Sequence, residues 1–425
     1  MPNQFTTSLW GDEGFSAILS MKSIPQILSI IARDTSPPLY NITEHVWFQI
    51  FGSSEVAIRS LSFLYFLIAI FFVYKIGAYL WDRRTGVVAA TLSFLNPFFF
   101  SYAFEGRMYS ILAAGAAASM YFFLRKNWLG YVVATAAMLY SHHFSIFILF
   151  VQGLWFLKEY FFGKRKVAIS MLISFIAVGI LYSPWLLPLY NQTKMVGGGF
   201  WLGTPTVKDF GRLILTYLNI SLIVLLIRKW AGSFQKSFIL LAWFILPILA
   251  TWLISQKFSS IFFDRYLLYT IPAAMILAAS ERTRISSVAI VAVIFAFIVT
   301  DAHYFTHPTK RPFKELAAYV KQTRQEGDFI INWYSNGTHH IWETKYYQIP
   351  GPIYVSGEGE LPFFVGTALM EESDIIRKLP ENIKRVGVVT SGPVEEITLP
   401  GYTKGEEASF GSLSFVWYQK DKRTR

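Results

Sequence analysis

The chain has 425 residues, of which 53% are hydrophobic, 18% aromatic and only 15% charged, with a net charge of +11. Soluble domains average about 25% charged residues, so this composition excludes an ordinary soluble protein. Apolar runs of about 20 residues recur along the chain, and each is long enough to cross the hydrocarbon layer of a bilayer. The sequence therefore predicts an integral, multi-pass membrane protein.

The distribution of the positive charge indicates membrane topology rather than a nucleic-acid-binding surface. Basic residues gather in alternate short loops between the apolar runs, and short loops rich in Lys and Arg stay on the cytoplasmic side. These residues are Arg83, Arg84, Arg125, Lys126, Lys164, Arg165, Lys166, Arg228, Lys229, Lys236, Arg282 and Arg284. We therefore expect no nucleic-acid partner. The chain has no cysteine, which excludes disulfides and thiolate metal sites.

Residues 1–55 predict a large first external loop. Asp12 is placed to cap a short helix, and Glu13 suits the positive N-terminal end of that helix. A second amphipathic piece, residues 24–31, leads to the proline pair Pro37-Pro38, which ends any helix. We expect these helices to lie along the membrane interface.

About ten spans are predicted between residues 56 and 303. They are placed at 56–80, 86–104, 107–124, 127–142, 144–162, 167–188, 210–228, 238–255, 265–280 and 285–303. Since the basic loops lie inside, the loops that contain Asp12, Glu105, His142, Gln192 and Asp264 lie outside. Both termini then lie outside as well. Either the short N-terminal segment crosses the membrane without a preceding span, or a first span is missing.

Residues 304–425 predict a small α/β domain on the extracytoplasmic side. Residues 312–321 repeat apolar side chains at helical spacing, and 329–333 and 385–390 resemble buried strands. Residues 412–417 alternate like a strand with one exposed face. The predicted fold is mainly α, with a polytopic transmembrane helical bundle over residues 1–303 and this α/β domain over 304–425.

The groups that could do chemistry gather in the outer loops. No predicted span carries an ionisable residue near its middle, which counts against a proton-coupled transporter. The outer groups are Asp12, Glu13, Asp34, Arg59, Glu105, Arg107, His142, His143, Asp264, Arg265 and Tyr266. Carboxylates, histidines and arginines on one face can bind a divalent metal and a phosphate, and can deprotonate a hydroxyl.

Each of these groups also has a plainer interpretation. Asp12 serves as a helix cap, and Asp34 belongs to a turn beside the prolines. The arginines anchor the ends of spans to lipid headgroups, and the two histidines pack at the interface. Glu105 and Arg107 form a local ion pair of little energetic consequence. All of these residues are predicted to lie on the same side of the membrane, and this shared location favours a single site that contains them.

Seven segments, taken in order, point to a known family. They are Trp10-Gly-Asp-Glu13, Asp34-Thr-Ser-Pro-Pro-Leu-Tyr40, Phe51 to Arg59, Gly86 to Pro97, Glu105-Gly-Arg-Met-Tyr-Ser110, Tyr140-Ser-His-His-Phe144 and Arg265-Tyr266. This set resembles the family 39 glycosyltransferases, which include dolichyl-phosphate-mannose protein mannosyltransferases and lipid A aminoarabinose transferases. The resemblance is best over residues 8–160 and weaker to 280. Two departures are the lack of a span before Asp12, and Ser36 where many relatives carry His or Lys.

The resemblance implies a GT-C fold and a polyprenyl-phosphate-linked sugar as the donor. It places the Asp-Glu motif of the family on Asp12 and Glu13, its external acid on Glu105, and its span-end arginine on Arg59. The implied protein is a glycosyltransferase of the cell membrane whose acceptor is a protein, a lipid or a glycan.

On this basis we expect sugar transfer from a polyprenyl phosphate to an acceptor hydroxyl, on the outer face and with inversion. The candidate catalytic residues are Asp12, Glu13 and Glu105, and Asp12 would be the general base. Glu13 lies about 100° further around the helix, so it better suits support of the loop or a metal. The predicted donor-phosphate ligands are Arg59, Arg107, Arg265 and Tyr266. The predicted ligands of a divalent metal ion are Asp34, His142 and His143, with Glu105 as an alternative member.

The alternative function is a lipid-linked-sugar flippase or another non-enzymatic membrane transporter. Such a protein needs polar residues along a path through the bilayer. The chain instead concentrates its polar groups at one surface, which favours the enzyme.

Overall fold

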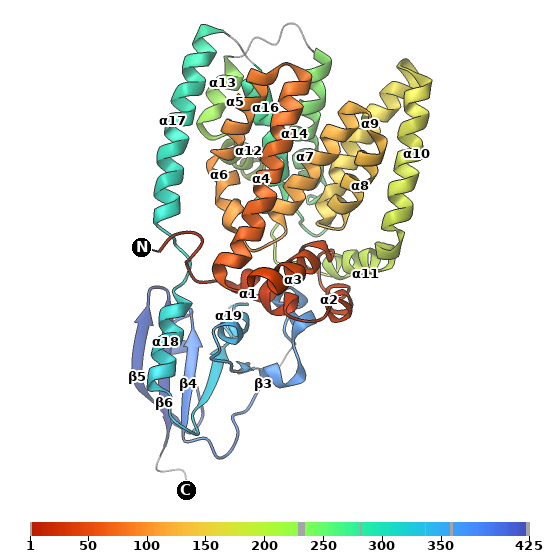
Figure 1. The fold of residues 1–425 in the computed structure, drawn as a ribbon. Coiled ribbons are helices and arrows are strands. Elements are labelled where there is room, and N and C mark those ends of the chain that lie inside the picture. The colour runs from red at the N-terminus through yellow and green to blue at the C-terminus, as the bar shows by residue number, and fades with distance from the viewer. Residues whose placement is uncertain (1, 228–233, 281–282, 336, 358–359, 422–425) are drawn as a thin grey trace. The chain divides into compact units, whose positions relative to one another are not determined.

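The structure is a computed structural model that describes residues 2–227, 234–280, 283–335, 337–357 and 360–421 (Figure 1). The topology signals Arg228, Lys229 and Arg282 lie outside these residues. Contacts divide the chain into two compact units. Unit 1 comprises Met1–Ile30, Glu44–Ile58 and His307–Arg425, and unit 2 comprises Ile31–Thr43 and Arg59–Thr306. The boundary between Thr306 and His307 lies close to the predicted division at residue 303, but most of the first external loop groups with the C-terminal residues rather than with the helical bundle.

Unit 2 is a bundle of helices. Its helices are α4 (Glu55–Leu80, whose first turn belongs to unit 1), α5 (Arg83–Phe94), α6 (Pro97–Ser101), α7 (Tyr109–Arg125), α8 (Trp128–Leu139), α9 (Ile146–Phe162), α10 (Arg165–Tyr182), α11 (Leu186–Gly197), α12 (Val207–Leu218), α13 (Leu222–Leu226), α14 (Phe234–Ile254), α15 (Asp264–Leu267), α16 (Ile271–Ala279) and α17 (Arg284–Thr306). Short 3₁₀ turns are η1 (Tyr102–Phe104), η2 (His143–Ser145), η3 (Ser183–Trp185), η4 (Asn219–Ser221) and η5 (Leu268–Thr270).

The number of long apolar helices differs from the ten predicted spans. Within the described residues, six helices are long and apolar enough to cross a membrane, or seven if α5 and the bent segment after it count as one span. That pair bends by 60° where Asn96 caps the segment beginning at Pro97. The predicted span at 127–142 contains the short helix α8, and the one at 265–280 contains most of α15, the turn η5 and the short helix α16. The backbone turns at Tyr140 and at η5 interrupt them.

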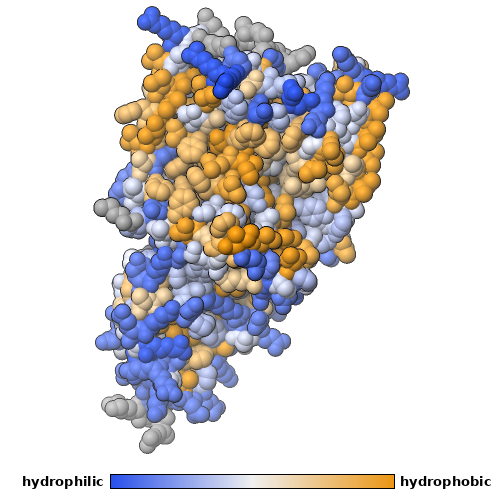
Figure 2. Space-filling model, in the orientation of Figure 1, coloured by the Kyte–Doolittle hydropathy of each residue, from blue (hydrophilic) through white to orange (hydrophobic). Residues whose placement is uncertain are grey.

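The surface of unit 2 is that of an integral membrane protein. Apolar side chains cover the outward faces of its helices, as the broad orange area in Figure 2 shows. Ile173 on α10 and Phe295 on α17 are 62% and 69% exposed. Large apolar side chains open to the surroundings on several long helices are expected where lipid replaces water.

Basic side chains gather at one end of this bundle, as the alternate loops predict. The Arg125 guanidinium lies 4.9 Å from the centre of the Tyr79 ring, and the Lys236 ammonium lies 5.9 Å from the Trp81 ring. Three of the predicted inner loops therefore meet. Aromatic rings beside cations are typical of a membrane–water interface.

Unit 1 contains a six-stranded sheet. Its strands are β1 (Phe329–Trp333), β2 (Ile353–Tyr354), β3 (Ile375–Ile376), β4 (Arg385–Thr390), β5 (Tyr402–Phe410) and β6 (Leu413–Lys420), in the order β3-β2-β1-β4-β6-β5. The first four of these in the sheet are parallel, and β6 pairs antiparallel with both β4 and β5. The predicted strands at 329–333 and 385–390 are confirmed with the same bounds.

Apolar side chains cover both faces of the sheet. Helix α18 (Phe313–Thr323) lies on one face, where Phe313 and Leu316 pack with Phe415 and Trp417 (Figure 1). A second cluster, which includes Val388 and Val416, lies on the other face. Since β1 and β4 are buried on both sides, they appear in the sequence as short, mostly apolar runs, which is why their prediction succeeds.

The N-terminal helices are α1 (Gly11–Ser20) and α2 (Ile24–Ile31), which belong to unit 1 up to Ile30, and α3 (Leu39–Phe51), which belongs to unit 1 from Glu44 onward. Helix α1 packs on α19 (Ile341–Tyr346), where the Phe15 and Trp342 rings meet edge to face at 5.5 Å. Gly14 permits this approach, because a Cβ there would lie 3.1 Å from the Trp342 carbonyl carbon. This packing explains why the N-terminal loop belongs to unit 1.

Replacing Gly14 with Ala is expected to lower the free energy of unfolding. The added methyl group must displace the backbone of α19, which costs about 1–3 kcal/mol, while the better helix propensity of Ala returns about 1 kcal/mol. Thermal unfolding of the full chain in detergent measures the difference. Gly211→Ala is the matched control, because a Cβ at Gly211 on α12 meets no atom within 4 Å. An unfolding midpoint equal in the two variants would contradict close α1–α19 packing.

Candidate functional site

The Asp-Glu motif lies in the first turn of α1. The helix begins at Gly11, so Asp12 is the second residue of the helix and not its N-cap, contrary to prediction. The side chain of Asp12 is partly exposed. Glu13 is fully buried, and its carboxylate accepts hydrogen bonds from Lys310 Nζ at 2.9 Å and from the Trp10 backbone N–H at 3.4 Å. This engagement favours support of the loop, one of the two roles predicted for Glu13, over contact with a substrate.

A chain of buried polar groups lies beside the start of α1. A Cβ placed on Gly11 would lie 3.6 Å from Glu343 Oε1. That oxygen lies 3.2 Å from His340 Nδ1, and His340 Nε2 lies 2.9 Å from Ser391 Oγ. The His340 imidazole is 1% exposed and lies against the Phe313 ring, 5.2 Å away. Because these groups are buried, they are better suited to hold the Glu343 carboxylate against α1 than to act as a nucleophile on a substrate. The sequence offers no local signal for this arrangement.

In unit 2, three loops far apart in sequence bring aromatic rings around Arg265. Its guanidinium carbon lies 4.9 Å from the centre of the Phe263 ring, 5.7 Å from Tyr109 and 5.8 Å from Tyr266. The His142 ring lies 5.3 Å from Tyr266 and 6.4 Å from Tyr109. The structure thus brings together Arg265, Tyr266 and His142, as the motifs predict, and adds Tyr109 to them.

His142 in this cluster is a neutral hydrogen-bond donor. The Phe144 backbone N–H donates to its Nδ1 at 3.1 Å, so the ring proton lies on Nε2. Burial lowers the pKa of His142 to about 3, and the nearby Arg107 and Arg265 guanidinium groups act in the same direction. His142 therefore carries no charge at neutral pH. Its Nε2–H suits the oxygen of a phosphate.

Gln192 connects His143 to the turn that contains Asp34, all within unit 2. His143 Nε2 lies 2.7 Å from Gln192 Oε1, and Gln192 Nε2 donates to the Ile31 and Ser36 carbonyl oxygens at 2.7 and 3.3 Å. The Ser36 hydroxyl in turn lies 3.5 Å from Asp34 Oδ2. Sequence reasoning missed Gln192, because nothing in its surroundings marks it apart from other polar residues of an outer loop.

Replacing Gln192 with Leu is expected to lower the free energy of unfolding by about 2–4 kcal/mol. The change leaves buried carbonyl oxygens without a donor, and each such group costs about 1–3 kcal/mol. The thermal unfolding midpoint in detergent is the measurement. Asn191→Leu, an exposed neighbour on α11, is the control and should leave the midpoint nearly unchanged. Equal effects of the two changes would exclude a structural role for the Gln192 amide.

Of the remaining predicted residues in unit 2, Arg59 and Glu105 are buried and Arg107 is partly exposed. Arg59 on α4 is 0% exposed, and the Glu105 side chain is 8% exposed. Arg107 follows Glu105 in a tight turn, in which the Arg107 N–H donates to the Glu105 carbonyl at 2.7 Å. A fully buried guanidinium is costly unless it is paired, which favours a structural role for Arg59. Its role in donor binding stays a prediction.

Within the described residues, no group of three or more His, Asp or Glu side chains is placed to hold a metal ion. His142 is the poorest candidate, because its Nδ1 lone pair is already used and its Nε2 carries the proton. His143 Nδ1 keeps a buried lone pair that has no partner among the described residues. Binding of a divalent metal stays a prediction.

Comparison with known proteins adds to this geometry. Residues 35–187 match a family model described as dolichyl-phosphate-mannose-protein mannosyltransferase. ArnT from Cupriavidus metallidurans in the apo state superposes with a TM-score of 0.69 at 15% identity, covering 97% of this chain and 94% of ArnT. The same ArnT bound to undecaprenyl phosphate superposes with a TM-score of 0.65 at 14% identity, with the same coverage of both chains. The Archaeoglobus fulgidus oligosaccharyltransferase in complex with Zn and sulfate superposes with a TM-score of 0.52 at 14% identity. The match covers 90% of this chain and 64% of the oligosaccharyltransferase. No curated protein sequence matches this chain.

These likenesses confirm the predicted GT-C fold, with a small α/β region at its C-terminal end. The family-model match also confirms the resemblance to the dolichyl-phosphate-mannose protein mannosyltransferases, which rested on seven short segments. The matched residues 35–187 contain four of those segments in full.

Proposed function

We propose that the protein is a membrane glycosyltransferase that moves a sugar from a polyprenyl-phosphate donor to an acceptor hydroxyl on the outer face of the membrane. The observation that carries this proposal is the Arg265 cluster, within a fold shared with a protein solved with undecaprenyl phosphate bound. Guanidinium groups bind phosphate oxygens through paired, charge-assisted hydrogen bonds.

In the proposed reaction, the Arg265 cluster binds the phosphate that leaves. Arg265 holds its oxygens and stabilises the charge that develops as the bond to the sugar breaks. The His142 Nε2–H donates one further hydrogen bond without adding charge. Arg107 adds positive charge nearby, as its effect on the pKa of His142 indicates. Since a phosphate monoester is a weakly basic leaving group, the reaction needs no general acid for it.

Asp12 is proposed as the general base. Its carboxylate takes the proton of the acceptor hydroxyl while the hydroxyl oxygen attacks the anomeric carbon, so that one displacement inverts the configuration. The partly exposed side chain of Asp12 supports this assignment, whereas Glu13 is buried and paired with Lys310.

Lipid and glycan analysis of membranes from cells with and without the gene tests the proposed function. The expected result is that one sugar disappears from an envelope lipid, glycan or protein while its polyprenyl-phosphate donor accumulates. Mass spectrometry measures both compounds. A flippase would instead be indicated if the donor accumulated on one leaflet only and purified protein moved intact donor across a proteoliposome bilayer. Purified protein that neither consumes nor moves the donor would overturn both functions.

A further inference from the structure

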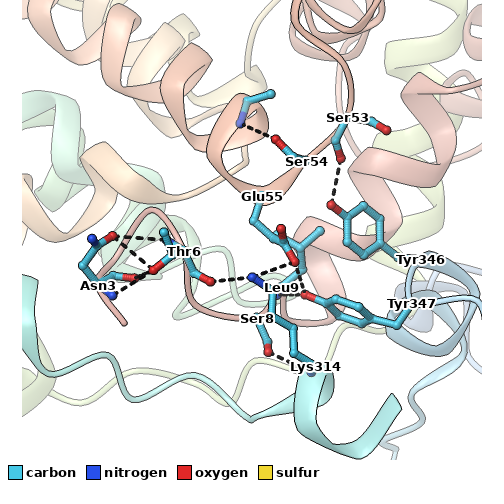
Figure 3. Close-up of polar contacts among 11 residues, drawn as sticks. Asn3, Thr6, Ser8, Leu9, Ser53, Ser54, Glu55, Lys314, Tyr346 and Tyr347 are labelled. Carbon is cyan, nitrogen blue, oxygen red and sulfur yellow. Dashed lines mark hydrogen bonds and ion pairs between the residues drawn. The ribbon is translucent and has the colours of Figure 1, made fainter. Parts of the chain in front are cut away.

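A surface pocket of about 550 Å³ lies within unit 1. It is formed by the end of α1, the start of α4, α18 and the end of α19, and is lined by Ile18, Met21, Ser53, Ser54, Glu55, Lys321, Lys345, Tyr346, Tyr347 and Gln348. Figure 3 shows two of its walls, with the Tyr346 and Tyr347 rings directed toward Ser53 and Glu55. Pockets of this volume take small molecules.

Hydrogen bonds between distant segments hold two walls of the pocket. The Tyr346 hydroxyl donates to the Ser53 carbonyl at 2.7 Å, and the Tyr347 hydroxyl donates to Glu55 Oε1 at 3.0 Å. The Tyr347 hydroxyl also accepts from the Leu9 backbone N–H at 2.9 Å (Figure 3). The two tyrosine rings are therefore fixed in place before a ligand arrives, which lowers the entropic cost of binding.

The charges of the pocket leave one positive charge for a ligand. Two charged lining residues, Glu55 and Lys345, already have ion-pair partners. Lys314 Nζ lies 3.1 Å from Glu55 Oε1, and Asp374 Oδ2 lies 2.6 Å from Lys345 Nζ. Lys321 is exposed, and its ammonium forms no hydrogen bond or ion pair with the described residues. A ligand with one anionic group would neutralise the remaining charge, that of Lys321.

Gln348 supplies a second unengaged group at an unusual backbone position. Its φ is +62°, in the left-handed region that favours glycine. The residue follows Tyr347, the C-cap of α19, and the Ile349 N–H donates back to the Thr344 carbonyl at 2.9 Å, the pattern of a helix end at which Gly is common. The amide side chain is exposed and forms no hydrogen bond with the described residues. It is available to a ligand in the pocket.

We propose that this pocket binds an anionic saccharide, the acceptor of the transfer reaction. The tyrosine rings suit the apolar C–H face of a sugar, the serine hydroxyls and the Gln348 amide suit its hydroxyls, and Lys321 suits its anionic group. The compact volume disfavours an extended acidic peptide. The assignment as acceptor rests on the proposed function. Ile18 of the pocket wall lies on the same helix as Asp12, about 9 Å further along its axis.

Binding of glucose 6-phosphate to the full chain in detergent tests this proposal. Saturation-transfer NMR is expected to show contact with the sugar protons. Lys321→Gln and Gln348→Gly should each lower the affinity about tenfold or more, because each removes a ligand contact. Gln348→Gly should leave the unfolding midpoint unchanged or raise it, since glycine prefers this backbone conformation. Arg324→Gln, which removes an exposed cation beside α18 but outside the pocket lining, is the matched control.

The outcomes separate this proposal from the others. Unchanged binding in both pocket variants would overturn the site. If an equal concentration of inorganic phosphate displaces all of the glucose 6-phosphate, the pocket recognises only the anion and not the sugar. If polyglutamate displaces glucose 6-phosphate preferentially, the pocket binds acidic peptides instead. Asp12→Asn should bind glucose 6-phosphate normally. If Asp12→Asn retains transfer while the pocket variants lose binding, the proposed catalysis fails and the pocket stands. If the pocket variants lose binding without raising the acceptor KM, its assignment to the acceptor is wrong.

Discussion

Replacing Asp12 with Asn is expected to lower the rate of sugar transfer by about 10²–10⁴-fold, the usual contribution of a general base. Asn has nearly the same shape but cannot accept the proton of the acceptor hydroxyl at neutral pH. Because α1 begins at Gly11 and Asp12 is only partly buried, the change should leave the helix and its packing on α19 intact. The measurement is the initial rate of release of polyprenyl phosphate from a labelled donor in membranes.

Asp209→Asn is the matched control for this experiment. Asp209 is another acidic residue in the first turn of a helix, α12, and it lies at the protein surface. Its replacement should leave transfer within about twofold of the parent, as expected of a surface substitution. A decrease of only a few-fold in Asp12→Asn, or equal decreases in both variants, would remove Asp12 from the role of base.

Replacing Arg265 with Ala is expected to lower transfer by about 10²–10³-fold, the cost of losing one charge-stabilising donor. The loss should appear in the use of the polyprenyl-phosphate donor much more than in the KM of the acceptor. Arg265→Lys should recover only part of the rate, since Lys keeps the charge but lacks the planar fork that binds two phosphate oxygens. Steady-state kinetics with each substrate varied in turn measure both effects.

Arg212→Ala controls for the loss of a guanidinium group. Arg212 is exposed, and its guanidinium forms one ion pair with the described part of the chain, a surface pair with Asp209 at 3.5 Å, which contributes little. Its replacement should leave both kinetic parameters nearly unchanged. If Arg265→Ala impairs donor and acceptor use equally, a folding defect rather than a phosphate ligand is indicated. An unfolding midpoint measured on the same preparations identifies that case.

Elements with a strong local pattern were predictable. The strands at 329–333 and 385–390 are mostly apolar because the sheet buries both of their faces. The helix predicted at 312–321 appears as α18, Phe313–Thr323. Strand β5 was not predicted, because Tyr402–Phe410 contains charged residues and little apolar alternation. It lies at the sheet edge and pairs only with β6, so its side chains need not be buried.

The candidate site was predictable only in part. Arg265, Tyr266 and His142 stand in recognisable motifs, and the structure brings them together with Tyr109. Gln192 was not predictable, because its function as a connection exists only once α11 lies beside the turn at Ser36. The same holds for Glu343, whose carboxylate reaches α1 from a helix more than 300 residues further along the chain.

The sequence by itself determined the membrane setting, the predominance of helix, the short α/β region and the identity of most reactive groups. These follow from composition and local periodicity, which neighbouring residues carry. The tertiary structure alone decided that the N-terminal helix belongs with the C-terminal sheet, that Glu13 is buried against Lys310, and which rings surround Arg265. Those outcomes depend on contacts between residues far apart in the chain, and no local pattern encodes such contacts.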